Sequence, residues 1–109
     1  MNKTDGTKIY LTRGDTLRRQ VVIQNEDGSD YQPAEGDRVR FALKKDYEDP
    51  EPLILKEIPT DTMTLELKPE DTKPLAFGDY VYDIELTKAN GDVDTFIACA
   101  CMKIMREVY

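Results

Sequence analysis

Apolar and polar residues alternate with a period of two along much of this chain. In residues 80–87, YVYDIELT, the apolar side chains fall on one face and the polar ones on the other, and residues 38–44 and 62–68 repeat the alternation. This pattern is typical of antiparallel β-strands with one buried and one solvated face. We expect further strands at Lys8–Thr12, Thr16–Gln24, Leu53–Ile58 and Val93–Met105. The last is long for a single strand, so we expect it to bend or break.

Turn signals separate these segments. Asn90-Gly91 lies between two apolar runs, and this pair readily supplies the positive φ angles of a tight hairpin. Residues 45–52 hold two prolines and four acids, which predicts an exposed connection. Helical signals occur only near residues 69–77, where Pro69 fits a first turn, Pro74 limits its length and Gly78 can end it.

These elements predict an all-β fold, an immunoglobulin-like antiparallel β-sandwich of about seven or eight strands with one short helical crossover near residues 69–77. The length of 109 residues predicts a single domain, 1–109. Leu, Ile, Val and Phe together make up 25 residues, just above the level at which disorder becomes the default. The chain is therefore foldable but polar, and a partner would help its stability.

The net charge and the short length of the apolar runs argue against several classes of function. The formal net charge is −7, which argues against a nucleic-acid partner. Arginines on neighbouring strands could form a local basic face, but solvated strand faces explain them equally well; they are Arg13, Arg18, Arg19, Arg38 and Arg40. No apolar run reaches the roughly 20 residues of a membrane span, and the N-terminus shows no secretion signal. We therefore expect synthesis in a cytoplasm and no membrane partner.

Catalytic machinery is not evident in the sequence. The chain contains no histidine, so an imidazole base cannot activate a serine or cysteine. Its 22 acids lie mostly in turns or on the outward phase of strands, and no glycine-rich phosphate loop is present. We expect no enzyme activity and no cofactor.

Cys99 and Cys101 lie two residues apart in one predicted strand, in phase with Ile97. Two thiolates without a histidine do not complete a tetrahedral zinc site unless chains pool them. We interpret the pair as small, reduced, buried hydrophobic residues that bind no metal. Carboxylates in residues 25–30 and 90–94 are spaced like loose calcium loops, yet turn chemistry explains both. Tyr31, Tyr47 and Tyr109 are the tyrosines that we expect to be exposed.

Several segments resemble small structural domains of phages. The stretches IYLTRGDTLRRQVVIQNEDGSDY, DRVRFALKK, LELKPEDTKPLAFGDYVYDIELT and NGDVDTF resemble the N-terminal domain of baseplate upper proteins of Gram-positive phages. In that family a Pro-Glu-Asp-Thr segment leads through a short helix to Gly-x-Tyr-x-Tyr-x-Ile. The last strand departs from the family pattern because it lacks the expected glycine. The resemblance implies a phage or prophage structural protein of a tail or baseplate, a virion component made in the bacterial host cytoplasm, and no catalysis.

The tripeptide Arg13-Gly14-Asp15 also spells an integrin-binding motif. We interpret it as a turn between two strands, in which Gly14 takes a positive φ and Asp15 accepts a hydrogen bond from a backbone N–H near Leu17. The predicted structural turns are therefore Gly14-Asp15 and Asn90-Gly91.

The leading functional hypothesis is a non-catalytic assembly module that binds other virion or tail proteins and can self-associate. The terminal strand is apolar on both phases, which predicts an interface there. The predicted interface residues are Phe96, Ile97, Met102, Ile104 and Val108. The alternative is a small-ligand or carbohydrate-binding β-sandwich that uses exposed tyrosines and acidic loops. Aromatic residues grouped at one loop end would favour binding, and an apolar or unpaired edge strand would favour assembly.

Overall fold

The computed structural model describes residues 8–106, with the side chain of Cys99 left out. Seven strands and one helical turn follow one another within this range. They are β1 (Ile9–Thr12), β2 (Leu17–Gln20), β3 (Arg38–Lys44), β4 (Ile54–Ile58), β5 (Thr64–Leu67), α1 (Pro69–Thr72), β6 (Gly78–Thr87) and β7 (Val93–Met105). The predicted all-β class is confirmed.

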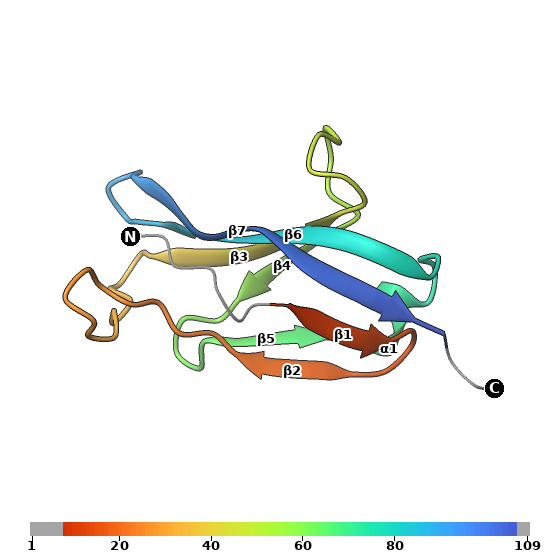
Figure 1. Ribbon diagram of the computed structural model, residues 1–109. Coiled ribbons are helices and arrows are strands. Elements are labelled where there is room, and N and C mark those ends of the chain that lie inside the picture. Colours follow the sequence, from red (N-terminus) through yellow and green to blue (C-terminus); the bar gives the residue numbers. More distant parts are fainter. Residues whose placement is uncertain (1–7, 107–109) are drawn as a thin grey trace.

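The strands form two sheets of unequal size. A five-stranded sheet has the order β1-β7-β6-β3-β4, and β2 pairs with β5 in a small second sheet that lies below it in Figure 1. The prediction of purely antiparallel strands is wrong, because β1 runs parallel to β7, with Ile9 opposite Met102. The other strand pairs are antiparallel. Since β1 and β7 are the first and last strands, the connection between them is long enough for parallel pairing.

One hydrophobic core lies between the two sheets. The residues that alternation placed inward are buried in β3, β5 and β6, which confirms the predicted phase of all three strands. Phe41 and Tyr82, on neighbouring strands, hold their ring centroids 5.3 Å apart in a tilted contact. The largest fully buried hydrophobic side chains are Val39, Phe41, Leu43, Ile58, Leu65, Leu67, Met102 and Ile104.

The last strand stays continuous, although its register against β6 is irregular. Tyr82 lies opposite Ala100, Ile84 opposite Ile97, and Glu85 opposite Thr95. One extra β7 residue is therefore inserted on each side of Ile97, which is the geometry of β-bulges. The expected bend is thus made by bulges and not by a break.

Two other elements are shorter than predicted. The helix α1 is a single turn that begins at Pro69, as expected, but it ends at Thr72, and Gly78 opens β6 instead of closing the helix. The strand predicted at Thr16–Gln24 ends at Gln20. Beyond it, the Val21 N–H donates to the Met63 carbonyl at 2.7 Å, and Met63 itself has φ +50°. The backbone turns away from regular pairing at this point.

Asp37 ties together the β2–β3 and β6–β7 loops at the end of the molecule away from α1. Its carboxylate accepts hydrogen bonds from the Tyr31 hydroxyl at 2.6 Å, the Ala34 N–H at 2.8 Å and the Ala89 N–H at 3.3 Å. The bond from Tyr31 is the main cause that holds the pKa of Asp37 below its ordinary value, and the same bond raises the pKa of Tyr31. The folded state therefore favours the ionised carboxylate.

We predict that Asp37→Asn reduces stability at neutral pH and that this loss shrinks in acid. The folded pKa of Asp37 is depressed, so its contribution is fully present above the ordinary value of 3.8 and disappears as the pH falls through the lower folded pKa. Thermal midpoints of wild type and variant between pH 7 and pH 3 should therefore converge at the acid end. Tyr31→Phe, which removes one hydrogen bond, should lie between them. Parallel curves would contradict this role of Asp37.

Candidate functional site

The Arg-Gly-Asp tripeptide forms a tight turn between β1 and β2. Gly14 has φ +85°, as predicted, and its N–H donates to the buried Thr72 hydroxyl at 2.9 Å. The Asp15 N–H donates to the Thr12 carbonyl at 3.0 Å and closes the turn through the backbone. The hydrogen bonds of the described residues include none from Leu17 to the Asp15 carboxylate, so that part of the prediction is wrong.

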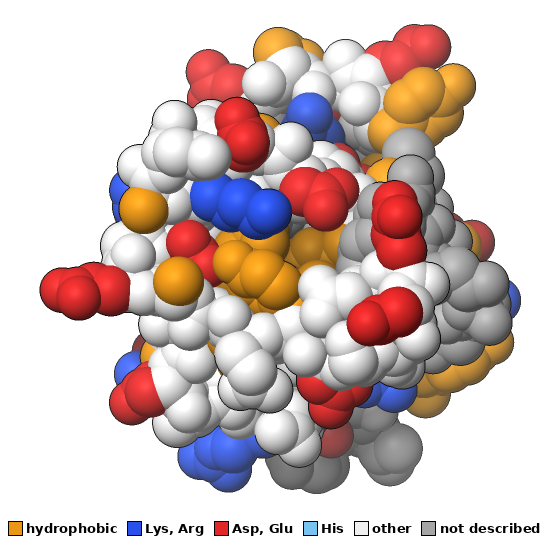
Figure 2. All heavy atoms as spheres, turned by 90° about the vertical axis from the view of Figure 1, so that its left-hand side faces the viewer, with side chains coloured by type: hydrophobic (Ala, Val, Ile, Leu, Met, Phe, Trp, Pro, Cys, Tyr) orange, Lys and Arg blue, Asp and Glu red, His pale blue; other side chains and the backbone are white. Residues whose placement is uncertain are grey.

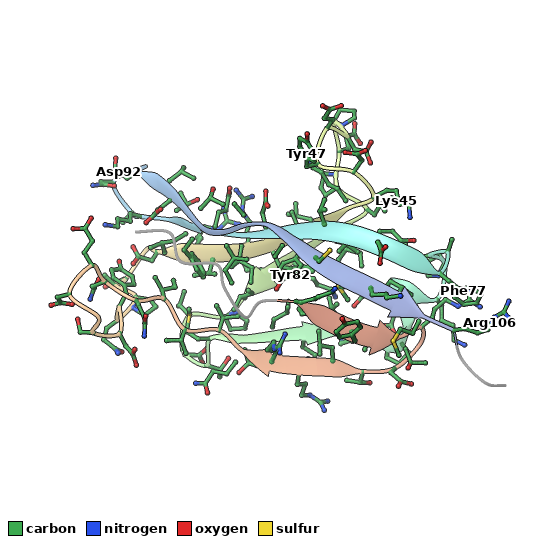
Figure 3. All side chains as sticks on the ribbon, in the orientation of Figure 1. Lys45, Tyr47, Phe77, Tyr82, Asp92 and Arg106 are labelled. Carbon is green, nitrogen blue, oxygen red and sulfur yellow. The ribbon has the colours of Figure 1, made fainter. Side chains whose placement is uncertain are left out.

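The side chain of Arg13 packs against the segment that follows α1. Its Nη1 donates to the Leu75 carbonyl at 3.2 Å, and its guanidinium lies 4.5 Å from the centroid of the Phe77 ring. Arg106, just after β7, lies 5.1 Å from the same ring, and Figure 3 shows Phe77 and Arg106 together at this end of the sheet. The first residue of the tripeptide therefore serves the fold and is half-buried.

The second predicted turn, Asn90-Gly91, connects β6 to β7. Gly91 has φ +97°. Asn90 is not among the described residues with positive φ, so only one of the two positive φ angles of the expected two-residue turn is present. Lys88 and Asp92 close the loop through the backbone. The Gly91 N–H donates to the Lys88 carbonyl, and the Lys88 N–H donates to the Asp92 carbonyl. This is a three-residue hairpin loop with Gly91 in the left-handed position.

The predicted interface on β7 does not form an accessible surface. Phe96, Met102 and Ile104 are at most 3% exposed and belong to the core, because alternate β7 residues face the second sheet. Ile97 is half-buried against the same core. Val108 lies outside the described residues. Nor is β7 an edge strand, since it lies between β1 and β6.

The cysteine prediction also needs correction. Cys101 is exposed and lies on the outer face of the large sheet, opposite Val81, and the side chain of Cys99 is outside the described part. The expected burial of Cys101 is therefore wrong. The described residues contain no group of three or more Cys, Asp or Glu side chains placed to hold a metal ion.

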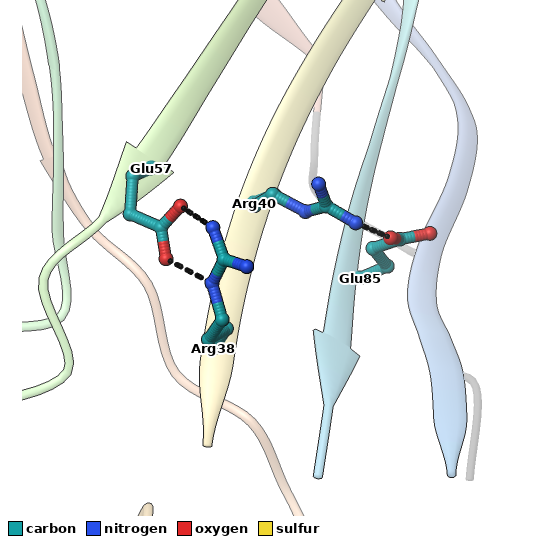
Figure 4. Close-up of polar contacts among 4 residues, drawn as sticks. All are labelled: Arg38, Arg40, Glu57 and Glu85. Carbon is teal, nitrogen blue, oxygen red and sulfur yellow. Dashed lines mark hydrogen bonds and ion pairs between the residues drawn. The ribbon is translucent and has the colours of Figure 1, made fainter. Parts of the chain in front are cut away.

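The outer face of the large sheet is divided into a charged half and an apolar half. In the charged half, Arg38 makes two hydrogen bonds to Glu57, at 3.0 and 3.1 Å, and Arg40 makes one to Glu85 at 3.1 Å (Figure 4). The bond from Arg38 lowers the pKa of Glu57. Arg38 and Arg40, two of the five arginines of the expected basic face, are thus neutralised by cross-strand glutamates.

The apolar half, which we call the hairpin face, surrounds the base of the β3–β4 hairpin. Its exposed side chains are Tyr47 (63%), Leu53 (51%) and Leu55 (56%), and Ala42 and Val81 lie half-buried beneath them. Leu55 is directly opposite Ala42 in the β3–β4 register. The hairpin projects from the sheet and carries Tyr47, as Figure 3 shows. It is ordered by its own bonds, including one from Lys44 Nζ to the Asp49 carbonyl at 2.8 Å.

The expected exposed tyrosines do not gather in one place. Tyr47 lies on the hairpin, whereas Tyr31 packs on the core and donates its hydroxyl proton to Asp37 at the opposite end. Tyr109 lies outside the described residues. A shared aromatic platform is therefore not formed by Tyr31 and Tyr47.

A polar groove of about 440 Å³ lies between the ends of β4 and β5. Among its charged side chains, Arg18 pairs with Glu66 at 2.9 Å, and Lys56 with Asp71 of α1 at 3.0 Å. Arg38 neutralises Glu57, which also lines the groove. Most of the charges in this groove are thus satisfied within the chain.

The loop end that carries Asp37 is strongly acidic. Residues 24–37, 59–63 and 88–94 contain eight acidic side chains and one lysine. Figure 2 looks at this end and shows acidic side chains spread around a central group of hydrophobic ones. Asp27 here accepts bonds from the Ser29 N–H and hydroxyl, so turn chemistry occupies the predicted calcium-like loop. Like charges make two such ends repel each other.

We predict that Gly14→Ala lowers the free energy of unfolding by about 1 kcal/mol or more, because alanine is strained at φ +85°. Asp15→Ala is the matched control and should change stability little, since the Asp15 side chain is exposed and the turn is closed by the backbone. Urea denaturation at equal slope measures both. Equal stability of Gly14→Ala and wild type would contradict the turn geometry.

No helix in the described residues is long and apolar enough to cross a membrane. The segments that carry the phage resemblance contact each other in space, through Gly14 and Thr72 and through Arg13 and Phe77. The chain matches no family model, no curated protein and no solved structure.

Proposed function

We propose that this protein is a non-catalytic assembly module of a phage or prophage particle, associated with the tail or baseplate, and that it docks through the hairpin face. The carrying observation is the set of exposed apolar side chains Tyr47, Leu53 and Leu55 around the β3–β4 hairpin, with Leu55 opposite Ala42 and Tyr47 beside Ala42 and Val81. Exposed apolar groups in such a cluster typically mark a protein-binding surface. The resemblance of the sequence to baseplate domains supports the choice of particle.

Docking through this face suits the position of β4 better than strand addition does. β4 is an edge of the large sheet, but Pro52 and Pro59 flank it. The side chain of Lys56, in the middle of β4, forms an ion pair with Asp71 of α1. Proline and inward-turning charge are the usual protections of an edge strand against pairing. The partner therefore meets side chains of the face, and the acids of the hairpin form the rim.

The finer fold class belongs to the same proposal. Two sheets packed around one core are what an immunoglobulin-like sandwich requires, with the parallel β1–β7 pair as its departure from antiparallel order. The alternative of a carbohydrate-binding module is less well supported, because Tyr31 and Tyr47 lie apart.

The test compares particles made with wild-type protein and with the double variant Leu53→Ser and Leu55→Ser. Both leucines are more than half exposed, so the variant should fold with an unchanged thermal midpoint. Loss of about 1 kcal/mol at each contact should reduce incorporation by roughly tenfold or more. Particles are purified on a density gradient from the strain that carries the gene, and the protein is quantified by immunoblot.

The control is Val93→Ser, which removes an apolar side chain of similar exposure, 60%, at the acidic end. It should be incorporated like the wild type. If wild-type protein is absent from purified particles, the proposed function fails. If the leucine variant is incorporated normally, the hairpin face is not the docking surface.

A further inference from the structure

An apolar cleft lies along the line between β1 and β2. These two strands are consecutive in sequence, yet in the described structure β1 pairs only with β7 and β2 only with β5. The cleft has a volume of about 220 Å³. Its apolar lining comes from both sheets and consists of Ile9, Val21, Val22, Leu65, Tyr82, Ile84 and Ile97, with Arg19 and Gln20 as its polar members.

Arg19 occupies a position that the strand pattern reserves for a hydrophobic residue. On β2, Leu17 lies opposite the buried Leu67, and Arg19 lies opposite the buried Leu65. Residues two apart share a face of a strand, so Arg19 is on the core face of the small sheet. Its neighbour Arg18 is on the other face, where it pairs with Glu66.

Arg19 also differs from the other arginines in having no partner among the described residues. No ion pair, hydrogen bond or ring contact of its side chain occurs in this part of the chain. Every other described arginine has one: Arg13 and Arg106 contact Phe77, and Arg18, Arg38 and Arg40 pair with glutamates. Arg19 is exposed, so its guanidinium lies in solvent at the border of the apolar cleft, where a ligand can reach it.

We propose that this cleft binds a small amphipathic carboxylate, with its apolar body among the cleft side chains and its carboxylate on Arg19. The planar fork of a guanidinium matches a carboxylate and forms charge-assisted hydrogen bonds with it. An apolar cavity of about 150 Å³ suffices to hold benzene, so the cleft has room for one aromatic ring or a short alkyl chain. The site is independent of the hairpin face, since the two share no residue.

The test uses phenylacetate as the carboxylate probe and phenylacetamide as its neutral isostere. Binding is followed by backbone amide shifts in ¹⁵N-labelled protein. We expect phenylacetate to give saturable shifts at millimolar concentration, concentrated in β2 and in the facing parts of β6 and β7. Phenylacetamide should bind more weakly, because an amide does not form the charged pair with Arg19.

Two neighbouring arginines supply the matched variants. Arg19→Gln should weaken phenylacetate binding by about tenfold or more and leave phenylacetamide binding unchanged. Arg18→Gln should leave both affinities as in wild type, because Arg18 pairs with Glu66 on the other face. The wild-type preference for the carboxylate remains a test even if a variant folds poorly.

The proposal would be overturned by no saturable shifts with either probe, by shifts centred on another surface, or by equal affinity of the wild type for the two probes. In the first case Arg19 would serve only as an exposed charge that keeps the edge of β2 from pairing. Equal losses in Arg18→Gln and Arg19→Gln would also reject the site, because they would reflect overall charge.

Discussion

The structure depends on the burial of one face of a small sheet against a larger one. The β2–β5 sheet has only two strands of four residues each, and an isolated pair of this size is marginally stable in water. Its inward leucines, Leu65 and Leu67, are fully buried only because the five-stranded sheet covers them. The small sheet is therefore stable only when it is packed on the large one.

Polar contacts at both ends of the molecule tie its loops together. At one end, the Gly14 N–H meets the Thr72 hydroxyl, and Arg13 packs on Phe77. At the other end, Asp37 joins the loop before β3 to the β6–β7 hairpin. These bonds join segments that are distant in sequence. The Arg13-Gly14-Asp15 tripeptide supplies one of these contacts, and its arginine and glycine therefore have structural roles.

The surfaces left over from this architecture have different chemistry. Cross-strand ion pairs neutralise one half of the large sheet's outer face, whereas the hairpin face exposes tyrosine and leucine. The unpaired line between β1 and β2 leaves an apolar cleft with an arginine on its border. Assembly through the hairpin face and ligand binding in the cleft are separate proposals, because the two surfaces share no residue.

The sequence by itself determined the strand faces and most of the turns. Period-two alternation places side chains by local geometry alone, so the inward phase of Phe41, Leu65 and Tyr82 was readable in advance. Pro69 marked the start of the helix for the same local reason. The core-phase position of Arg19, between Leu17 and Val21, was also visible as a polar break in the alternation, but nothing local showed that a cleft lay beside it.

Only the tertiary structure decided which strands are neighbours. The parallel pairing of β1 with β7 places β7 inside the large sheet, and the packing of the second sheet on its inner face makes core residues of Met102 and Ile104, which were predicted as interface. β4 pairs only with β3 and is therefore an edge, and Leu55 lies exposed on its outer face. Strand order is set by the packing of segments far apart in the chain, and a pattern of local alternation is the same whichever neighbour a strand acquires.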